Sequence, residues 1–233
     1  MSVLAKHTQG KGGPDKIFRI SGMAKARAAE VGKENITNAT TGAFLDANGR
    51  LITLKTVEET VKEIPFSDAA EYATIEGSPA FIEAAIDAAF REYRPTAYID
   101  GIATPGGTGG IHHALFNYLD DGDTAITMDR YWAAYKSICR ETGRNFDTFV
   151  MFDEQGNFNV QGCIEKLREY AAKQTNVFLI LNTPANNPTG YNVKQQEWEA
   201  IMAELTAIAN NGKNNVVLLV DIAYIDFAAP ESR

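Results

Sequence analysis

Several features that would assign a chain to a large structural class are scarce or absent in this sequence. Among its 233 residues are only two cysteines, Cys139 and Cys163, and neither belongs to a Cys-x-x-Cys pair or a histidine-rich segment. Neither a disulfide framework nor a zinc site is therefore indicated. Both cysteines are expected to be buried, reduced thiols.

Long apolar runs and clusters of basic residues are also missing. No segment approaches the roughly 18 apolar residues of a membrane span, and Met1–Pro14 lacks the apolar centre of a signal peptide. The net charge is -8, and the lysines and arginines form no cluster that would meet a phosphate backbone. We therefore expect a cytoplasmic protein that binds neither membranes nor nucleic acid.

The sequence does contain a regular alternation of strand-type and helical patterns. With 45% hydrophobic residues it can build a substantial core. The expected strands are residues 97–103, 124–128, 145–151, 177–181 and 216–220, and the helices between them are residues 111–119, 131–141, 160–173 and 193–209. This alternation predicts an α/β fold with a mainly parallel sheet covered on both faces. Residues 1 to about 50 form a more loosely patterned arm.

Two polar clusters follow the last two predicted strands. Residues 182–190 are Asn-Thr-Pro-Ala-Asn-Asn-Pro-Thr-Gly, and residues 221–224 are Asp-Ile-Ala-Tyr. In an open α/β sheet, ligands bind at the carboxyl ends of the strands. The two clusters are therefore predicted to form a site at that edge.

A glycine-rich turn, residues 104–110, links the first predicted strand to a helix. Such a turn suits a phosphate, because free backbone N–H groups and the helix dipole both favour an anion. The turn lacks Gly-x-Gly-x-x-Gly with a later acid and also Gly-Lys-Ser/Thr, so neither a dinucleotide site nor a P-loop is indicated. An ordinary tight turn is the alternative.

An aromatic pair, Tyr131 and Trp132, follows the second predicted strand. Such a pair is either a core anchor or a ligand platform, and the ligand groups on neighbouring strand ends favour the platform. A flat, phosphorylated cofactor with a ring nitrogen would use all of these groups, which points to pyridoxal phosphate. A buried carboxylate such as Asp221 would keep the ring nitrogen protonated, as an electron sink requires. Asn187 and Tyr224 would donate to the phenolate oxygen.

Together these motifs resemble those of the class I aminotransferases, the aspartate and aromatic group of pyridoxal-phosphate enzymes. In order, the matching motifs are Tyr72 with Gly77-Ser-Pro-Ala-Phe81, Gly107-Thr108-Gly109, Trp132 with Lys136-Ser137, Asn187-Pro-Thr-Gly190 and Asp221-Ile-Ala-Tyr224. The resemblance extends from about Asn35 to the last residue. It implies an incomplete three-layer αβα large domain over residues 51–233 and an arm, residues 1–50, that belongs to a small domain.

The resemblance also implies roles for individual residues. Asp221 and Tyr224 belong to the catalytic machinery, and the implied cofactor-binding residues are Gly107, Thr108, Trp132, Asn187, Asp221 and Tyr224. Tyr72 resembles the tyrosine that reaches the phosphate of the neighbouring subunit, which implies a homodimer. Gly42 resembles the glycine near the substrate carboxylate. Family members usually carry Ser or Ala in place of Gly106 or Gly107, so one phosphate contact is expected to be missing.

The family's Schiff-base lysine is expected beyond the Asp-x-Ala-Tyr motif, but the sequence stops at Arg233. Without that lysine there is no covalent anchor and no base for the proton shift, so the 233 residues alone are expected not to transaminate. The resemblance also implies two further strands between residues 97–103 and 216–220. We therefore expect the N-terminal half of a longer enzyme, truncated or nicked, with a C-terminal half of the same polypeptide as partner.

The leading interpretation is an aminotransferase that moves an amino group from an aspartate-type or aromatic amino acid to a 2-oxo acid. One alternative is a pyridoxal-phosphate lyase or decarboxylase, because the same residues stabilise any Cα carbanion. Another is a non-catalytic fragment that binds only phosphate or a partner. His112 and His113 are interpreted as helix-packing residues, because adjacent helical side chains point about 100° apart.

Overall fold

The computed structural model describes residues 3–9, 16–40 and 42–229. The chain divides into two compact units, Met1–Tyr72 and Ala73–Arg233. The sequence placed the start of the large domain near residue 51, and that domain boundary stays a prediction. Within the described residues, no helix is long and apolar enough to cross a membrane.

The first unit consists of short helices and extended segments. Its helices are α1 (Lys16–Val31), α2 (Lys55–Glu63) and α3 (Phe66–Ala70), with 3-10 turns at Lys6–Thr8 and Lys33–Asn35. A turn at Asn48 and Gly49 closes a short hairpin with a single antiparallel bridge between Leu45 and Leu51. Ser21 is the one buried residue among those described in this unit. The unit therefore has no hydrophobic core of its own in its described part.

The second unit is built on a four-stranded parallel sheet. Its strands are β1 (Thr124–Met128), β2 (Asn145–Phe149), β3 (Asn176–Asn182) and β4 (Asn215–Asp221), in the order β2-β1-β3-β4. The register pairs Asn182 with Asp221 at the carboxyl ends of β3 and β4. The two polar clusters therefore begin side by side.

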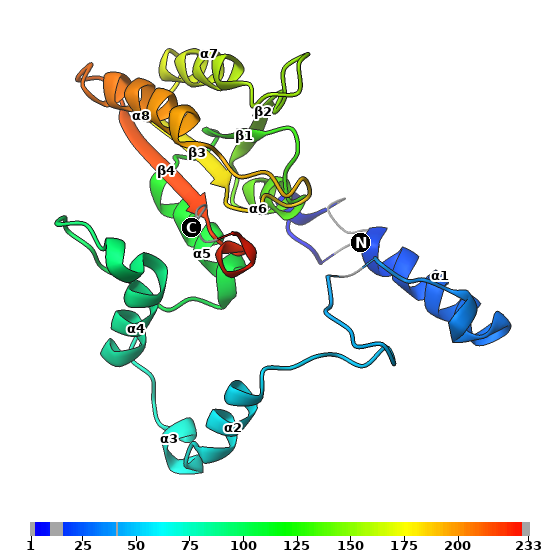
Figure 1. The fold of residues 1–233 in the computed structure, drawn as a ribbon. Helices are drawn as coiled ribbons and strands as arrows, with labels where there is room; N and C mark the ends of the chain where they lie inside the picture. Colours follow the sequence, from blue (N-terminus) through cyan, green and yellow to red (C-terminus); the bar gives the residue numbers. More distant parts are fainter. Residues whose placement is uncertain (1–2, 10–15, 41, 230–233) are drawn as a thin grey trace. The chain divides into compact units, whose positions relative to one another are not determined.

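Helices cover both faces of this sheet (Figure 1). On one face lie α7 (Val160–Ala171) and α8 (Gln195–Ala209), and on the other lie α5 (Gly106–Tyr118) and α6 (Ala134–Glu141). Strand β3 is buried on both sides, because Leu179 packs with α7 and α8 whereas Phe178 and Ile180 pack with α5 and α6. The predicted three-layer αβα architecture is confirmed. Both cysteines are buried and unpaired, as expected.

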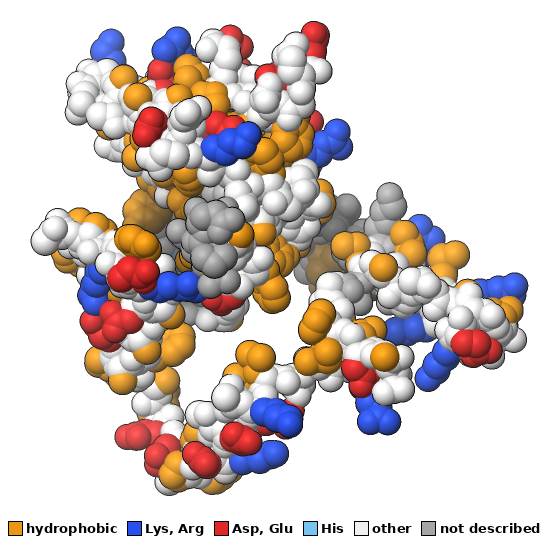
Figure 2. Space-filling model, viewed as in Figure 1, with side chains coloured by type: hydrophobic (Ala, Val, Ile, Leu, Met, Phe, Trp, Pro, Cys, Tyr) orange, Lys and Arg blue, Asp and Glu red, His pale blue; other side chains and the backbone are white. Residues whose placement is uncertain are grey.

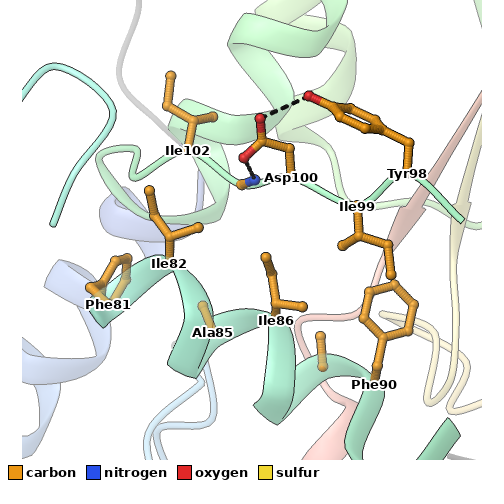
Figure 3. Close-up of a pocket in the computed structure, with 11 residues that line it drawn as sticks. Phe81, Ile82, Ala85, Ile86, Phe90, Tyr98, Ile99, Asp100 and Ile102 are labelled. Atoms are coloured by element: carbon orange, nitrogen blue, oxygen red, sulfur yellow. Dashed lines mark hydrogen bonds between the residues drawn. The ribbon is translucent and has the colours of Figure 1, made fainter. Parts of the chain in front are cut away.

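The predicted strand at residues 97–103 is wrong. The segment is extended, but none of the four strands pairs with it, and a strand requires a neighbour with which to exchange backbone hydrogen bonds. It lies instead along α4 (Pro79–Phe90), around an open groove of about 410 Å³. Figure 3 shows Ile82 and Ile86 of α4 opposite Ile99 and Ile102 of this segment. One face of α4, with Ile82 and Ile86, is therefore partly buried against this segment.

Helix α4 begins at a Ser-Pro pair that is typical of a helix N-terminus. Pro79 occupies its first turn, and the Ser78 hydroxyl accepts a hydrogen bond from the Phe81 N–H at 3.2 Å. Many large hydrophobic side chains nevertheless stay at the surface of the described residues (Figure 2). In this part of the chain they include Phe81, Tyr98 and Ile102.

Candidate active site

A cavity of about 200 Å³ opens at the carboxyl edge of the sheet, beside the N-terminus of α5. It is lined by Gly107, Thr108, Ile111, Trp132, Asn182, Asn187, Asp221, Ala223 and Tyr224. The cofactor-binding residues predicted from the sequence that belong to the second unit are all in this set. Residues separated by more than a hundred positions thus meet at one site.

The ends of β3 and β4 are held together by Asn182. This buried side chain donates through Nδ2 to the Asp221 carbonyl at 2.9 Å and accepts the Asn187 N–H through Oδ1 at 2.6 Å. One amide therefore connects the acid of β4 to the loop after β3. Sequence reasoning placed Asn182 in the polar cluster after β3 but gave it no individual role, although its position at the end of a buried strand was a usable signal.

Asn187 and Tyr224 form a hydrogen-bonded pair beyond the carboxyl ends of β3 and β4. Asn187 Nδ2 donates to the Tyr224 hydroxyl at 3.1 Å. An amide nitrogen carries two hydrogens and a phenol carries one, so one hydrogen remains on each side chain. None of the described residues accepts either of them. The pair can therefore donate two hydrogen bonds to a single oxygen of a ligand.

Asp221 is the one charged residue that lines the cavity. Its Oδ1 accepts the Ala223 N–H at 3.1 Å, and its Oδ2 accepts a short hydrogen bond from the Tyr135 hydroxyl. The ion pairs of the described residues do not include it. A half-buried carboxylate without a cation favours a ligand that brings a positive charge.

Tyr135 was missed by the sequence reasoning. It is fully buried on α6, and its ring meets the Trp132 ring edge-on at a centroid distance of 5.7 Å. Burial, followed by the hydrogen bond to Asp221, raises the pKa of the Tyr135 hydroxyl far above its usual range. The spacing of three residues from Trp132 indicated that the two side chains lie on one side of a helical turn, but not which acid Tyr135 would meet.

The glycine-rich turn is itself the first turn of α5. The helix begins at Gly106 rather than at the predicted residue 111, and Pro105 at its N-cap supplies no side-chain hydrogen bond. The first N–H groups of an α-helix have no acceptor within the helix, so those of Gly107 and Thr108 are available beside the cavity. A Cβ at Gly109 would lie 2.8 Å from Pro105 Cδ, which explains a glycine there.

These features fit pyridoxal phosphate at three chemically distinct points. Uncapped helix N–H groups suit its phosphate, a carboxylate without a cation suits its protonated ring nitrogen, and the two donors of Asn187 and Tyr224 suit its phenolic oxygen. The cavity has no lysine or arginine among its lining residues. Within the described chain, no group of His, Cys, Asp and Glu side chains could hold a metal ion.

Four further candidate residues are not among those that line this cavity. Tyr72 and Gly42 belong to the first unit, where both are exposed, and their roles stay predictions. His112 and His113 are exposed on α5 and do not line the cavity, and their interpretation as packing residues stays a prediction. The His112 ring does stack on Phe116, at a centroid distance of 6.2 Å.

Comparisons with known proteins agree with this geometry. The family model described as aminotransferase class I and II matches residues 34–233. The cytoplasmic aspartate aminotransferase of Schizosaccharomyces pombe is 26% identical over 226 residues, which cover 92% of this chain and 52% of that protein. An L-tyrosine:2-oxoglutarate aminotransferase of Aspergillus ustus is 30% identical over 207 residues, covering 82% of this chain and 38% of that protein.

A solved structure is also similar over nearly the whole chain. The crystal structure of an aminotransferase from Anaerococcus prevotii DSM 20548 has a TM-score of 0.94 and 39% identity, covering 98% of this chain and 56% of that chain. The chain spans about half the length of the first curated relatives it matches. Its folded core, its convergent polar cavity and the match over residues 34–233 lead to one conclusion. The chain belongs to the class I and II aminotransferases, whose aspartate and aromatic members are pyridoxal-phosphate enzymes.

Proposed function

We propose that this chain supplies the cofactor-binding face of a pyridoxal-phosphate-dependent aminotransferase. The enzyme transfers an amino group from an aspartate-type or aromatic amino acid to a 2-oxo acid. The convergence of Gly107, Thr108, Trp132, Asn187, Asp221 and Tyr224 on one cavity carries this proposal. The names of relatives, which include aspartate and aromatic-amino-acid aminotransferases, support the substrate type.

The chain's own residues bind and orient the cofactor. When bound, pyridoxal phosphate supplies an electron sink for negative charge at the substrate Cα. Asp221 keeps a proton on the ring nitrogen through a charge-assisted hydrogen bond of roughly 1.5 to 3 kcal/mol. Asn187 and Tyr224 donate to the phenolic oxygen, and the tuning of that oxygen by Tyr224 is its catalytic role. Trp132 covers the ring and excludes water from it.

The phosphate lies at the N-terminus of α5 in this proposal. The N–H groups of Gly107 and Thr108 and the Thr108 hydroxyl hold it, and the helix dipole adds a favourable field of about 0.3 to 1 kcal/mol. No cationic side chain lines the cavity. The phosphate charge is therefore only partly balanced by the 233 residues, and Tyr72 of a partner subunit in a cytoplasmic homodimer adds a further contact.

The 233 residues alone bind the cofactor reversibly and do not transaminate. The cavity has no lysine among its lining residues, so no covalent bond to the cofactor forms there. A C-terminal half of the same polypeptide, carrying the family's Schiff-base lysine, completes the enzyme. Gly42, in the first unit, lies near the substrate carboxylate in the assembled protein.

Cofactor titration of the 233-residue chain tests the site. Pyridoxal phosphate is added while its absorbance is followed, and the Asp221→Asn variant is compared with Asp120→Asn, an exposed acid in the turn after α5. We expect saturable binding that weakens at least about tenfold in Asp221→Asn, which corresponds to 1.4 kcal/mol, and is unchanged in Asp120→Asn. After borohydride treatment, the native chain and Asp221→Asn should carry the same amount of covalently bound cofactor, because only lysines outside the cavity can react. Equal affinity of the two variants, or no saturable binding, contradicts the proposal.

The reaction itself is tested on the complete enzyme. Aspartate and tyrosine are each assayed with 2-oxoglutarate, and amino transfer to form glutamate is expected. Release of ammonia or carbon dioxide without glutamate formation would instead support a lyase or decarboxylase.

A further inference from the structure

The buried Tyr135–Asp221 hydrogen bond lies directly behind the candidate ring-binding carboxylate. We infer that Tyr135 is a positioning residue that holds the Asp221 carboxylate in its orientation towards the cavity. The part of this inference that concerns the cofactor rests on the proposed function, whereas the coupling between the two side chains does not.

The packing of Tyr135 allows its hydroxyl little freedom. The side chain is fully buried in the core cluster between α5, α6 and the sheet, with Leu115 and Phe178 among its neighbours. Its backbone N–H donates to the Trp132 carbonyl at 3.0 Å, and its ring meets the Trp132 ring at 89°. A buried hydroxyl without a partner costs about 1 to 3 kcal/mol, so the hydroxyl is held to the carboxylate it reaches.

The side chains that face Asp221 are electrically neutral. The titratable groups that face it are Tyr135 from α6 and Tyr224 from the segment after β4. Strand β3 and its loop contribute the amides of Asn182 and Asn187, and α5 contributes Gly107 and Thr108. No cation among the described residues competes with Tyr135 for the carboxylate. The neutral Tyr135 hydroxyl therefore holds the Asp221 carboxylate in place, as a cation would in a salt bridge. Unlike a cation, it leaves the negative charge of the carboxylate uncompensated.

This arrangement has a consequence for cofactor binding. A hydrogen bond donated to the ionised carboxylate stabilises that form, which is the form that binds a protonated ring nitrogen. Because Tyr135 contacts one oxygen from the core side and the Ala223 N–H contacts the other, the carboxylate plane is fixed at two points. Its remaining lone pairs are presented to the cavity. Burial raises the pKa of the Tyr135 hydroxyl, so it stays a donor wherever Asp221 is ionised.

The first experiment uses the cofactor-free chain. The carboxylate carbon of Asp221 is followed by 13C NMR through an acid titration of the native protein and of Tyr135→Phe, which keeps the ring and its contact with Trp132. The control is Tyr170→Phe, because Tyr170 donates to Asp147 at 2.8 Å in the same way. We expect the Asp221 midpoint to rise in Tyr135→Phe, because the ionised form loses its donor, and to stay unchanged in Tyr170→Phe. An unchanged midpoint in Tyr135→Phe overturns the inference.

A second measurement covers the case in which Tyr135→Phe does not fold. The hydroxyl proton of Tyr135 is observed by 1H NMR in the native chain and in Asp221→Asn. A downfield resonance that moves upfield when the carboxylate is replaced supports the coupling. A resonance at the same position in both proteins overturns it.

The last experiment separates this inference from the proposed function. The affinity for pyridoxal phosphate is measured against pH in the native chain and in Tyr135→Phe. Binding is lost at low pH, as free Asp221 takes up a proton. We expect this loss to occur at higher pH in Tyr135→Phe than in the native chain, by the same pH interval as the NMR midpoint. If native protein binds no cofactor while the NMR shift is present, the proposed function fails and the coupling stands. If the cofactor binds and neither profile moves, Tyr135 has no positioning role.

Discussion

The Asn187 side-chain amide donates to the Tyr224 hydroxyl across 3.1 Å and so joins the loop after β3 to the segment after β4. The same loop is also held to the last residue of β3, because the Asn187 N–H donates to the buried Asn182 side chain at 2.6 Å. The position of the amide therefore depends on both strand ends. The geometry of the site should therefore be sensitive to single substitutions among these hydrogen-bonded residues, even where the hydrophobic core is unchanged.

Replacing Asn187 by alanine should weaken the binding of pyridoxal phosphate. The change removes one donor to the phenolic oxygen and leaves Tyr224 without its partner, a loss of about 1 to 2 kcal/mol or roughly 5- to 30-fold in affinity. Spectral titration measures the effect. Asn117→Ala, on the exposed side of α5, is the matched control and should leave affinity unchanged. An equal loss in both variants would attribute the effect to general destabilisation.

A serine at Gly107 should strengthen phosphate binding. A Cβ at this position meets no atom within 4 Å, so the side chain fits, and its hydroxyl adds a donor at the N-terminus of α5. The expected gain is about 0.5 to 1.5 kcal/mol, read from the affinity for pyridoxal phosphate.

Gly109→Ala tests the opposite case in the same turn. Its Cβ would lie 2.8 Å from Pro105 Cδ, so the turn must shift. Overpacking of this kind typically costs about 1 to 3 kcal/mol in the free energy of unfolding.

Weaker cofactor binding by Gly107→Ser than by the native chain would contradict the placement of the phosphate at this turn.

Arg144 should contribute to stability by capping the C-terminal end of α5. Its Nη2 donates to the carbonyls of Leu119 at 2.7 Å and Phe116 at 3.1 Å, and its guanidinium lies 4.9 Å from the Phe116 ring centroid. Arg144→Ala should lower the free energy of unfolding by about 1.5 to 3 kcal/mol. Arg144→Lys should recover only part of this loss, because lysine lacks the planar fork.

Urea unfolding measures this difference against Arg168→Ala. Arg168 is exposed and pairs with Glu204, so its removal should cost less stability than the removal of Arg144. A loss for Arg144→Ala no larger than for Arg168→Ala would remove Arg144 from the capping role.

The buried thiols should make stability fall at high pH. Burial raises the pKa of Cys139 to about 11 and of Cys163 to about 12, from an ordinary value of 9.0. Unfolded chains lose these protons first, so the thiols' contribution to the free energy of unfolding is complete below pH 9.0 and is lost as pH rises towards 12.

Two measurements check this pH dependence. A thiol reagent should not react with the native chain near neutral pH and should react with both cysteines once urea unfolds it. Between pH 8 and 11, the free energy of unfolding should fall more steeply with pH in the native chain than in Cys163→Ala. Identical slopes would mean that the Cys163 thiol contributes nothing to the pH dependence.

Much of the fold follows from local sequence patterns. The apolar segments that became β1 to β4 are separated by helical periodicity, and this alternation predicts a parallel, doubly covered sheet. The start of α4 at Pro79 was predictable for a similar reason, because the capping hydroxyl of Ser78 followed by proline acts within one turn. The wrong strand at residues 97–103 marks the limit of such patterns, since an extended apolar segment becomes a strand only beside a partner.

The sequence by itself determined which residue types stand at the ends of the strands: the acid and tyrosine after β4, the asparagine loop after β3 and the glycine turn at α5. These positions depend on neighbours in the chain. Tertiary structure alone decided that Tyr135 meets Asp221, 86 positions away, and that Asn187 meets Tyr224, 37 positions away. Such pairs are set by strand order, register and the packing of α6 on the sheet, and no local preference along the chain specifies them.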